Sequence, residues 1–345
     1  MAGTLLLGPA RCGSTLISRM LADHPAVLSL SECFAMIGPR AFRPDFCDGP
    51  AFWRALSEPL PGMSRIGNPD TAPDEFLYHL AARRAHDPWR CPPLLAITLP
   101  HLSDDPDALF DALRPVIMAR GYGPLAGHYL ALFGELARGR GPAPGVWAER
   151  SGGSLAAAGV LTRMFPQARR IVLLRAGADT ALSLRDYIPG RLAIWLWRNG
   201  MGLIDPISVR GHLGRGAVWP LMARVGGVLP LGPVLRRRPS LRDCGRFWSA
   251  LMCRGEAALA GGPVLTLRYE DLLADPRAGA RRLGMAVADA APASWLARAA
   301  ALPRARAARL AGLDRADRDI LLEACAPGEG AAARLHARGG EGVGG

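Results

Sequence analysis

The sequence predicts an α/β fold in which a parallel sheet is flanked by helices. Residues 3–7, 146–149 and 170–174 are compact apolar segments with the length of buried strands, and a helix-like pattern follows each of them. Residues 264–276 repeat this arrangement of strand and helix. Strands that alternate with helices indicate a parallel sheet with helices on both faces. Ligands of such sheets bind at the carboxyl ends of the strands, so the site residues are expected there.

The first strand leads directly into a glycine-bounded loop and a helix over residues 14–22. Two long stretches, 40–140 and 186–245, separate the strand units and are predicted to be insertions, the first of them with helix-like segments such as 105–122. We expect one domain over 1–325. Residues 326–345 contain few apolar side chains and are predicted to form a flexible tail.

The composition argues against several classes of protein. The formal net charge is +12, but all 42 basic residues are arginine, they are spread along the chain, and only 6% of residues are aromatic. A nucleic-acid platform clusters its basic and stacking side chains, so we expect no nucleic-acid partner. The seven cysteines form no CxxC pair, which predicts reduced thiols and no metal site. The oligomeric state cannot be read from the sequence.

No part of the sequence predicts a membrane span or a signal peptide, and we expect a cytoplasmic protein. The most apolar window, 218–235, contains Arg224 and three prolines, which a spanning helix tolerates poorly. This window is predicted to form an apolar lid, or a surface that makes peripheral contact with an apolar partner.

A candidate anion loop follows the first strand. It consists of Gly8, Pro9, Ala10, Arg11, Cys12, Gly13, Ser14 and Thr15. Backbone N–H groups and the positive end of a helix dipole make such a turn suitable for an anion. Gly8 and Gly13 have the spacing of a nucleotide phosphate loop, but Ser14 follows where that loop has lysine. Arg11 supplies the only positive charge, so the sequence predicts a P-loop-type fold that does not act as an ordinary ATPase.

Further motifs follow the loop in a characteristic order. Glu32 ends the segment "LADHPAVLSLSE", Arg175 ends a strand with Ser183 eight residues later, and Tyr269 belongs to "LTLRYEDLLADP". In this order the segments resemble the sulfotransferases that use 3′-phosphoadenosine 5′-phosphosulfate (PAPS). The similarity is greatest to the bacterial branch and to the tyrosylprotein sulfotransferases, and it covers roughly residues 3–35 and 145–285.

The resemblance implies an enzyme that moves a sulfuryl group from PAPS to a hydroxyl or an amine. The acceptor would be a small molecule, a sugar, a lipid or a peptide, bound where the two insertions shape a pocket. The loop would hold the 5′-phosphosulfate without metal, and Arg11 would stabilise its charge. Arg175 and Ser183 would bind the 3′-phosphate, with Tyr269 nearby. The family often has a second arginine where this chain has Ala178.

The resemblance also implies which residues take part in catalysis. Glu32 is the candidate general base, because the tyrosylprotein branch has a glutamate at the same distance from the loop arginine. His101 is a rival, since cytosolic members use a histidine before Leu-Pro, although the order here is Pro-His-Leu. Arg150, which stands where the family commonly has Glu-Lys-Thr-Pro, is expected to assist charge stabilisation.

Two other functions remain open at this point. An ATP-using kinase or hydrolase would share the loop but normally needs the missing lysine. A protein that binds PAPS without catalysis would account for Ala178 and for the altered segment at Arg150. A phosphatase of the Cys-x5-Arg type is excluded, because Cys12 would require arginine at the position of Ser18.

Overall fold

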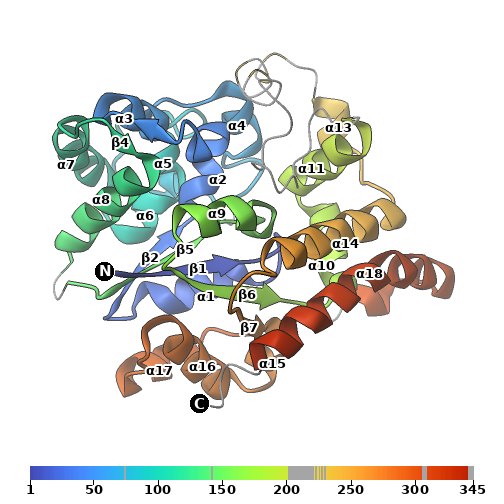
Figure 1. The fold of residues 1–345 in the computed structure, drawn as a ribbon. Coiled ribbons are helices and arrows are strands. Elements are labelled where there is room, and N and C mark those ends of the chain that lie inside the picture. Colours follow the sequence, from blue (N-terminus) through green and yellow to red (C-terminus); the bar gives the residue numbers. More distant parts are fainter. Residues whose placement is uncertain are drawn as a thin grey trace.

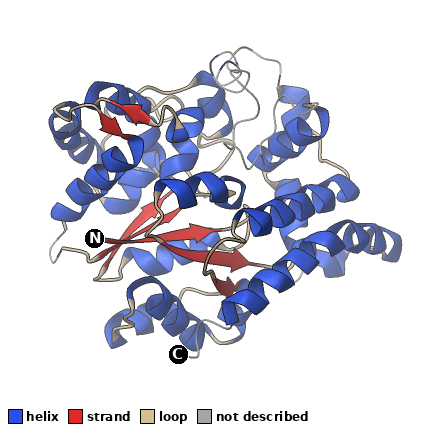
Figure 2. Cartoon of the chain, viewed as in Figure 1, coloured by secondary structure: helices blue, strands red, loops and turns tan. Residues whose placement is uncertain are grey.

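A computed structural model describes residues 1–73, 75–140, 143–200, 231–304 and 309–340, together with positions 221, 224, 226 and 228. At its centre lies a parallel five-stranded sheet with the strand order β2-β5-β1-β6-β7 (Figures 1 and 2). Its strands are β1 (Ala2–Leu7), β2 (Val27–Ser31), β5 (Val146–Arg150), β6 (Arg169–Leu174) and β7 (Leu265–Arg268). The predicted α/β fold is confirmed, and β2 is an additional strand that was not predicted from the sequence.

Helices cover both faces of the sheet, and β1, β2, β5 and β6 contribute side chains to both cores. Leu6, Ile171 and Leu173 belong to the smaller core on one face of the sheet, whereas Leu5 and Val172 belong to the larger core on the opposite face. On the first face lie α1 (Ser14–Ala22), α15 (Tyr269–Ala274), α16 (Pro276–Ala288) and α17 (Ala293–Ala300). Strands buried on both faces explain the nearly continuous apolar runs in the sequence.

The remaining elements build the opposite face and the two insertions. Between β2 and β5 lie α2 (Cys33–Ile37), η1 (Gly38–Phe42), β3 (Phe46–Cys47), α3 (Gly49–Ser57), α4 (Pro61–Ile66), η2 (Tyr78–Leu80), α5 (Pro93–Ala96), α6 (Thr98–Leu102), α7 (Pro106–Met118), β4 (Gly123–Pro124) and α8 (Leu125–Arg138). After β5 come η3 (Ser154–Ala157), α9 (Ala158–Met164), α10 (Gly177–Asp186), α11 (Ile188–Asn199), α13 (Gly232–Arg236), α14 (Leu241–Ala258), η4 (Arg309–Gly312) and α18 (Arg315–Gly340).

The predicted flexible tail is wrong over residues 326–340, which belong to the helix α18 and pack beside α14 (Figure 1). Small residues allow the two helices to approach closely: a Cβ on Gly245 would lie 2.6 Å from that of Ala324. Ala331 and Leu335 are fully buried in this contact. The segment has few large apolar side chains, which suggested a flexible tail. Its alanines and glycines instead allow the helices to pack closely.

Half of the apolar window 218–235 lies outside the described residues, so its predicted role stays a prediction. Across the described part of the chain, no helix is both long and apolar enough to cross a membrane.

Candidate functional site

The loop after β1 is held in place by contacts with the turn after β5. The Gly8 N–H donates to Ser154 Oγ at 3.3 Å, and the Gly8 carbonyl accepts from the Leu155 N–H at 3.1 Å. Gly13 begins α1 with a φ of 91°, and a Cβ there would lie 2.3 Å from the Tyr269 ring. The N-cap of α1 is a glycine and offers no side-chain cap, and the N–H groups and the dipole of a helix N-terminus are the groups that bind anions at such loops.

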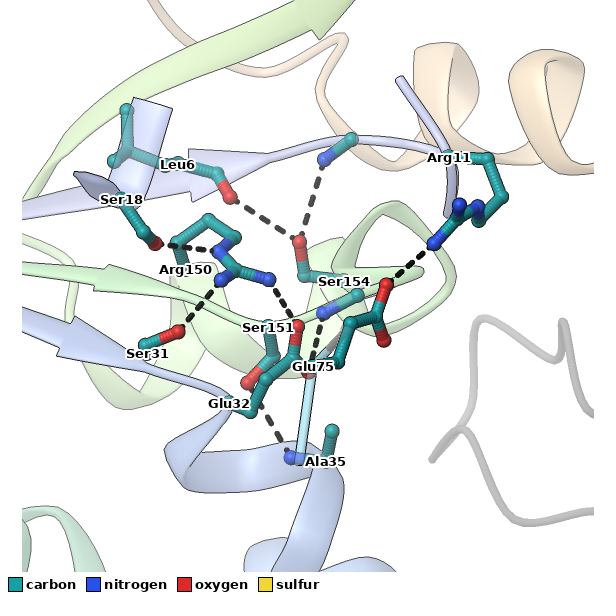
Figure 3. Close-up of polar contacts among 12 residues, drawn as sticks. Leu6, Arg11, Ser18, Ser31, Glu32, Ala35, Glu75, Arg150, Ser151 and Ser154 are labelled. Atoms are coloured by element: carbon teal, nitrogen blue, oxygen red, sulfur yellow. Dashed lines mark hydrogen bonds and ion pairs between the residues drawn. The ribbon is translucent and has the colours of Figure 1, made fainter. Parts of the chain in front are cut away.

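Arg11 reaches from this loop toward the insertions. Its Nη1 donates to Glu75 Oε1 at 2.5 Å (Figure 3), and its Nε donates to Ser183 Oγ at 3.2 Å. The guanidinium carbon lies 4.7 Å from the centre of the Tyr187 ring. Arg11 has a φ of 70°, a conformation that non-glycine residues adopt rarely and that occurs preferentially at functional sites.

Arg175 supports the loop from the carboxyl end of β6. Its Nη1 donates to the Arg11 carbonyl at 2.9 Å, and its guanidinium lies over the Tyr269 ring at 4.9 Å. The structure therefore brings together four of the residues that were predicted to bind PAPS, namely Arg11, Arg175, Ser183 and Tyr269.

Two carboxylates cap α10, which begins at Gly177, two residues after Arg175. The Ala176 N–H donates to Glu270 at 2.8 Å, and the Gly177 N–H donates to Glu329 at 2.6 Å. Carboxylates at this end of a helix satisfy free N–H groups and complement its dipole. Glu329 comes from α18, so the segment predicted to be a tail takes part in building the site.

Glu32 lies at the carboxyl end of β2, where it is the N-cap of α2 and has a φ of 57°. Its Oε2 accepts from the Gly152 N–H at 2.8 Å, and its Oε1 forms an ion pair with Arg150 (Figure 3). Burial raises the pKa of Glu32 above its usual value, the Arg150 guanidinium opposes this rise, and the Glu75 charge adds to it. A carboxyl group with a raised pKa in a cavity suits proton transfer.

Arg150 lies behind Glu32 and does not line the cavity described below. Its Nε donates to Ser18 Oγ at 2.7 Å, and its Nη2 donates to Ser31 Oγ at 2.6 Å. Together with the ion pair to Glu32, each of the three guanidinium nitrogens has a hydrogen-bond partner, and the group is almost completely buried. This geometry fixes the Glu32 carboxylate, and the predicted part of Arg150 in charge stabilisation stays a prediction.

A second buried carboxyl lies beside this ion pair. Glu149 accepts a hydrogen bond of 2.6 Å from Ser151 Oγ, which in turn accepts from the Phe34 and Ala35 N–H groups at the start of α2. Burial is the main cause that raises the pKa of Glu149 to about 8, and the nearby Glu32 charge adds to it. Glu149 is thus mostly protonated at neutral pH, which limits the negative charge beneath Glu32.

The loop and Glu32 face one cavity of about 240 Å³ at the carboxyl end of the sheet. Arg11, Ser14, Glu32, Glu75 and Tyr187 line its polar end. Apolar side chains from the first insertion and from α10, α11 and α14 form the other walls.

Two residues that were considered for catalysis from the sequence, His101 and Cys12, do not line this cavity. His101 on α6 contacts Ser29 at 3.2 Å on the far side of β2, and burial lowers its pKa to about 4. Cys12 is buried beneath the loop, and burial raises the pKa of its thiol to about 11. At neutral pH the histidine is therefore uncharged and Cys12 is a thiol rather than a nucleophilic thiolate.

Sequence reasoning missed two residues of the site, Glu75 and Tyr187. The Tyr187 hydroxyl donates to Glu75 Oε2 at 2.7 Å, while Oε1 of the same carboxylate contacts Arg11. Both residues belong to the insertions, and no local motif surrounds them. The sequence contained one indirect indication of Glu75. Arg11 is predicted to bind an anion, and without a ligand such an arginine is expected to pair with a carboxylate of the protein.

No family model and no curated protein matches the chain. Among solved structures it is similar to the sulfotransferase domain from the curacin biosynthetic pathway, with a TM-score of 0.46 and 13% identity over 97% of this chain and 98% of that one. A sulfotransferase from Alicyclobacillus acidocaldarius gives 0.41 and 16% identity over 98% and 96%. The sulfotransferase domain of the Synechococcus PCC 7002 olefin synthase gives 0.39 and 16% identity over 97% and 93%. At these values the likeness concerns the fold, and an activity has to follow from the residues of the site.

Proposed function

We propose that this protein is a sulfotransferase that moves a sulfuryl group from PAPS to a hydroxyl or amine, with Glu32 as general base. The observation that carries the proposal is that one cavity contains both an anion loop with Arg11 and a buried carboxylate whose pKa is raised. The motifs that resemble PAPS-dependent enzymes supply the identity of the anion.

In the proposed reaction the acceptor oxygen forms a bond to sulfur as the bond from sulfur to the bridging oxygen of PAPS breaks. The bridging oxygen leaves with the electron pair as part of 3′-phosphoadenosine 5′-phosphate (PAP). Arg11 and the N–H groups of the loop stabilise the negative charge that develops there. The acceptor proton moves to Glu32, whose oxygens each hold one hydrogen-bond partner and keep a lone pair free for it.

Arg175 and Ser183 are assigned to the 3′-phosphate that distinguishes PAPS from ATP. Both already contact Arg11, so binding at one phosphate position is coupled to the geometry at the other. Ala178 supplies no second guanidinium, and Arg175 therefore carries most of the charge-assisted contact.

The test is calorimetry with PAP and with ADP in the absence of Mg²⁺. We expect PAP to bind with micromolar affinity or better and ADP to bind much more weakly. Arg175→Ala should weaken PAP binding by about 10- to 150-fold, the equivalent of ~1.5–3 kcal/mol for charge-assisted hydrogen bonds. Equal affinities for PAP and ADP would contradict the proposal, and Mg²⁺-dependent turnover of ATP would favour a kinase or hydrolase instead. Tight PAP binding without transfer from labelled PAPS to any acceptor class would indicate a non-catalytic protein.

A further inference from the structure

The walls of the cavity separate polar from apolar side chains. Among the described residues that line it, every charged or hydroxyl-bearing side chain lies at the loop end, and the others are apolar or glycine. The apolar walls include Met63 from α4, Phe76, Leu192 and Leu196 from α11, and Phe247 and Leu251 from α14. A ligand that enters from the loop end therefore passes from a polar environment into an apolar one.

The polar end carries two carboxylates and one guanidinium. Glu32 and Glu75 face the space beside Arg11, and Arg11 is already paired with Glu75. A second anionic group close to the acceptor hydroxyl would meet these two charges without a free cation among the described lining residues. A sugar or peptide backbone would place further polar groups against the apolar walls, where each unpaired group costs about 1–3 kcal/mol.

We propose that the acceptor is a neutral alcohol with a single reacting hydroxyl and an apolar body that fills the cavity between α4, α11 and α14. This inference rests on the proposed sulfuryl transfer and names the substrate class for it. The hydroxyl lies at Glu32, and the apolar body is recognised by burial rather than by hydrogen bonds.

The first experiment measures binding without any transfer. 1-Hexanol, 1-octanol and 1-decanol are titrated by calorimetry into the protein saturated with PAP. We expect the affinity to rise about fourfold per methylene while the chain still fits, the equivalent of ~0.8 kcal/mol. 1,5-Octanediol, which carries a hydroxyl in mid-chain, should bind about 5- to 150-fold more weakly than 1-octanol. Methyl 2-hydroxyoctanoate should bind at least about fivefold better than 2-hydroxyoctanoate, because only the acid carries a charge beside Glu32 and Glu75.

Matched variants test whether the cavity is the binding site. Ala193 lines the cavity from α11, so Ala193→Leu should weaken 1-decanol binding more than 1-hexanol binding. Met63→Gln keeps the size of the side chain and adds a polar amide, and it should weaken all three alcohols. Ala297→Leu, on an exposed helical position of α17, is the control and should change none of them.

Transfer from labelled PAPS to the same alcohols separates the two hypotheses. Alcohol binding that depends on chain length, with no sulfated product from any acceptor, would refute sulfuryl transfer and leave the assignment of the cavity intact. Transfer to a sugar or peptide, with alcohol affinities independent of chain length, would overturn the inference while the proposed function stands. Unchanged alcohol binding in both Ala193→Leu and Met63→Gln would likewise overturn it.

Discussion

Arg150→Met is expected to destabilise the protein through the charge that it leaves behind. The side chains of Arg150 and Glu32 are only 4% and 7% exposed, and the guanidinium is the counter-ion of the carboxylate. Removing one partner of a buried pair costs about 3–5 kcal/mol, because the other charge stays in a poor solvent. The free energy of unfolding from urea denaturation should fall by this amount at pH 8.

The loss should also depend on pH. Burial already raises the pKa of Glu32, and removal of the guanidinium raises it further. Between the pKa of the unfolded chain and this raised folded value, the native state binds more protons than the unfolded state, so stability falls as the pH rises. The destabilisation by Arg150→Met should therefore be larger at pH 8 than at pH 5.

Two variants control for the loss of packing and for an ordinary surface pair. The double variant Glu32→Gln/Arg150→Met removes both charges and should be more stable than Arg150→Met alone at pH 8. Arg169→Met breaks a pair with Asp289 whose side chains are 43% and 68% exposed, and it should cost at most about 1 kcal/mol. If Arg150→Met costs no more than Arg169→Met, the buried ion pair does not hold Glu32 as described.

Three further outcomes can be measured. Glu32→Gln should lower kcat by about 10²- to 10⁴-fold and abolish the acidic limb of the pH profile of kcat, and the double variant Glu32→Gln/Arg150→Met should do the same. The PAP affinity measured by calorimetry should stay within a few-fold. Because the pKa of Glu149 is raised from 4.5 to about 8, wild-type stability in urea should fall over that range by up to about 1.4 kcal/mol per pH unit, and Glu149→Gln should lose this contribution; equal slopes would refute it. Gly13→Ala should abolish PAP binding, since its Cβ would lie 2.3 Å from the Tyr269 ring at a φ of 91°; Gly139→Ala, with nothing within 4 Å, should retain it.

The sheet was predictable where strands are buried by apolar side chains alone. Residues 171–174 are an unbroken apolar run after two arginines, and they form most of β6. β2 was missed because the predicted strands are continuous apolar runs, whereas its sequence, VLSLS, has serine at two of five positions. Ser29 and Ser31 are nonetheless buried, because Ser29 contacts His101 and Ser31 accepts from Arg150. Such hydrogen bonds come from residues far away in the sequence, so no local pattern reveals them.

The residues of the candidate site were likewise predictable only in part. Arg11, Arg175 and Ser183 belong to motifs that keep a fixed place next to a strand, and the structure brings them into contact. Glu75 and Tyr187 come from insertions whose course depends on tertiary packing, so sequence position says nothing about their neighbours. The contacts of Arg150 could not be predicted for a related reason: its three partners lie on β2, on α1 and at the N-cap of α2.

The contacts of Arg11 explain why the loop carries arginine and not lysine. Its guanidinium donates to Glu75 and Ser183 through different nitrogens while its plane lies near the Tyr187 ring. An ammonium group is a point charge on a flexible stem and cannot satisfy a fork of this kind together with a ring contact. A lysine at this position would neutralise one carboxylate and leave the Ser183 hydroxyl without its donor. The residue that supplies the only positive charge of the loop is therefore also the one that joins the loop, α10 and both insertions into one site.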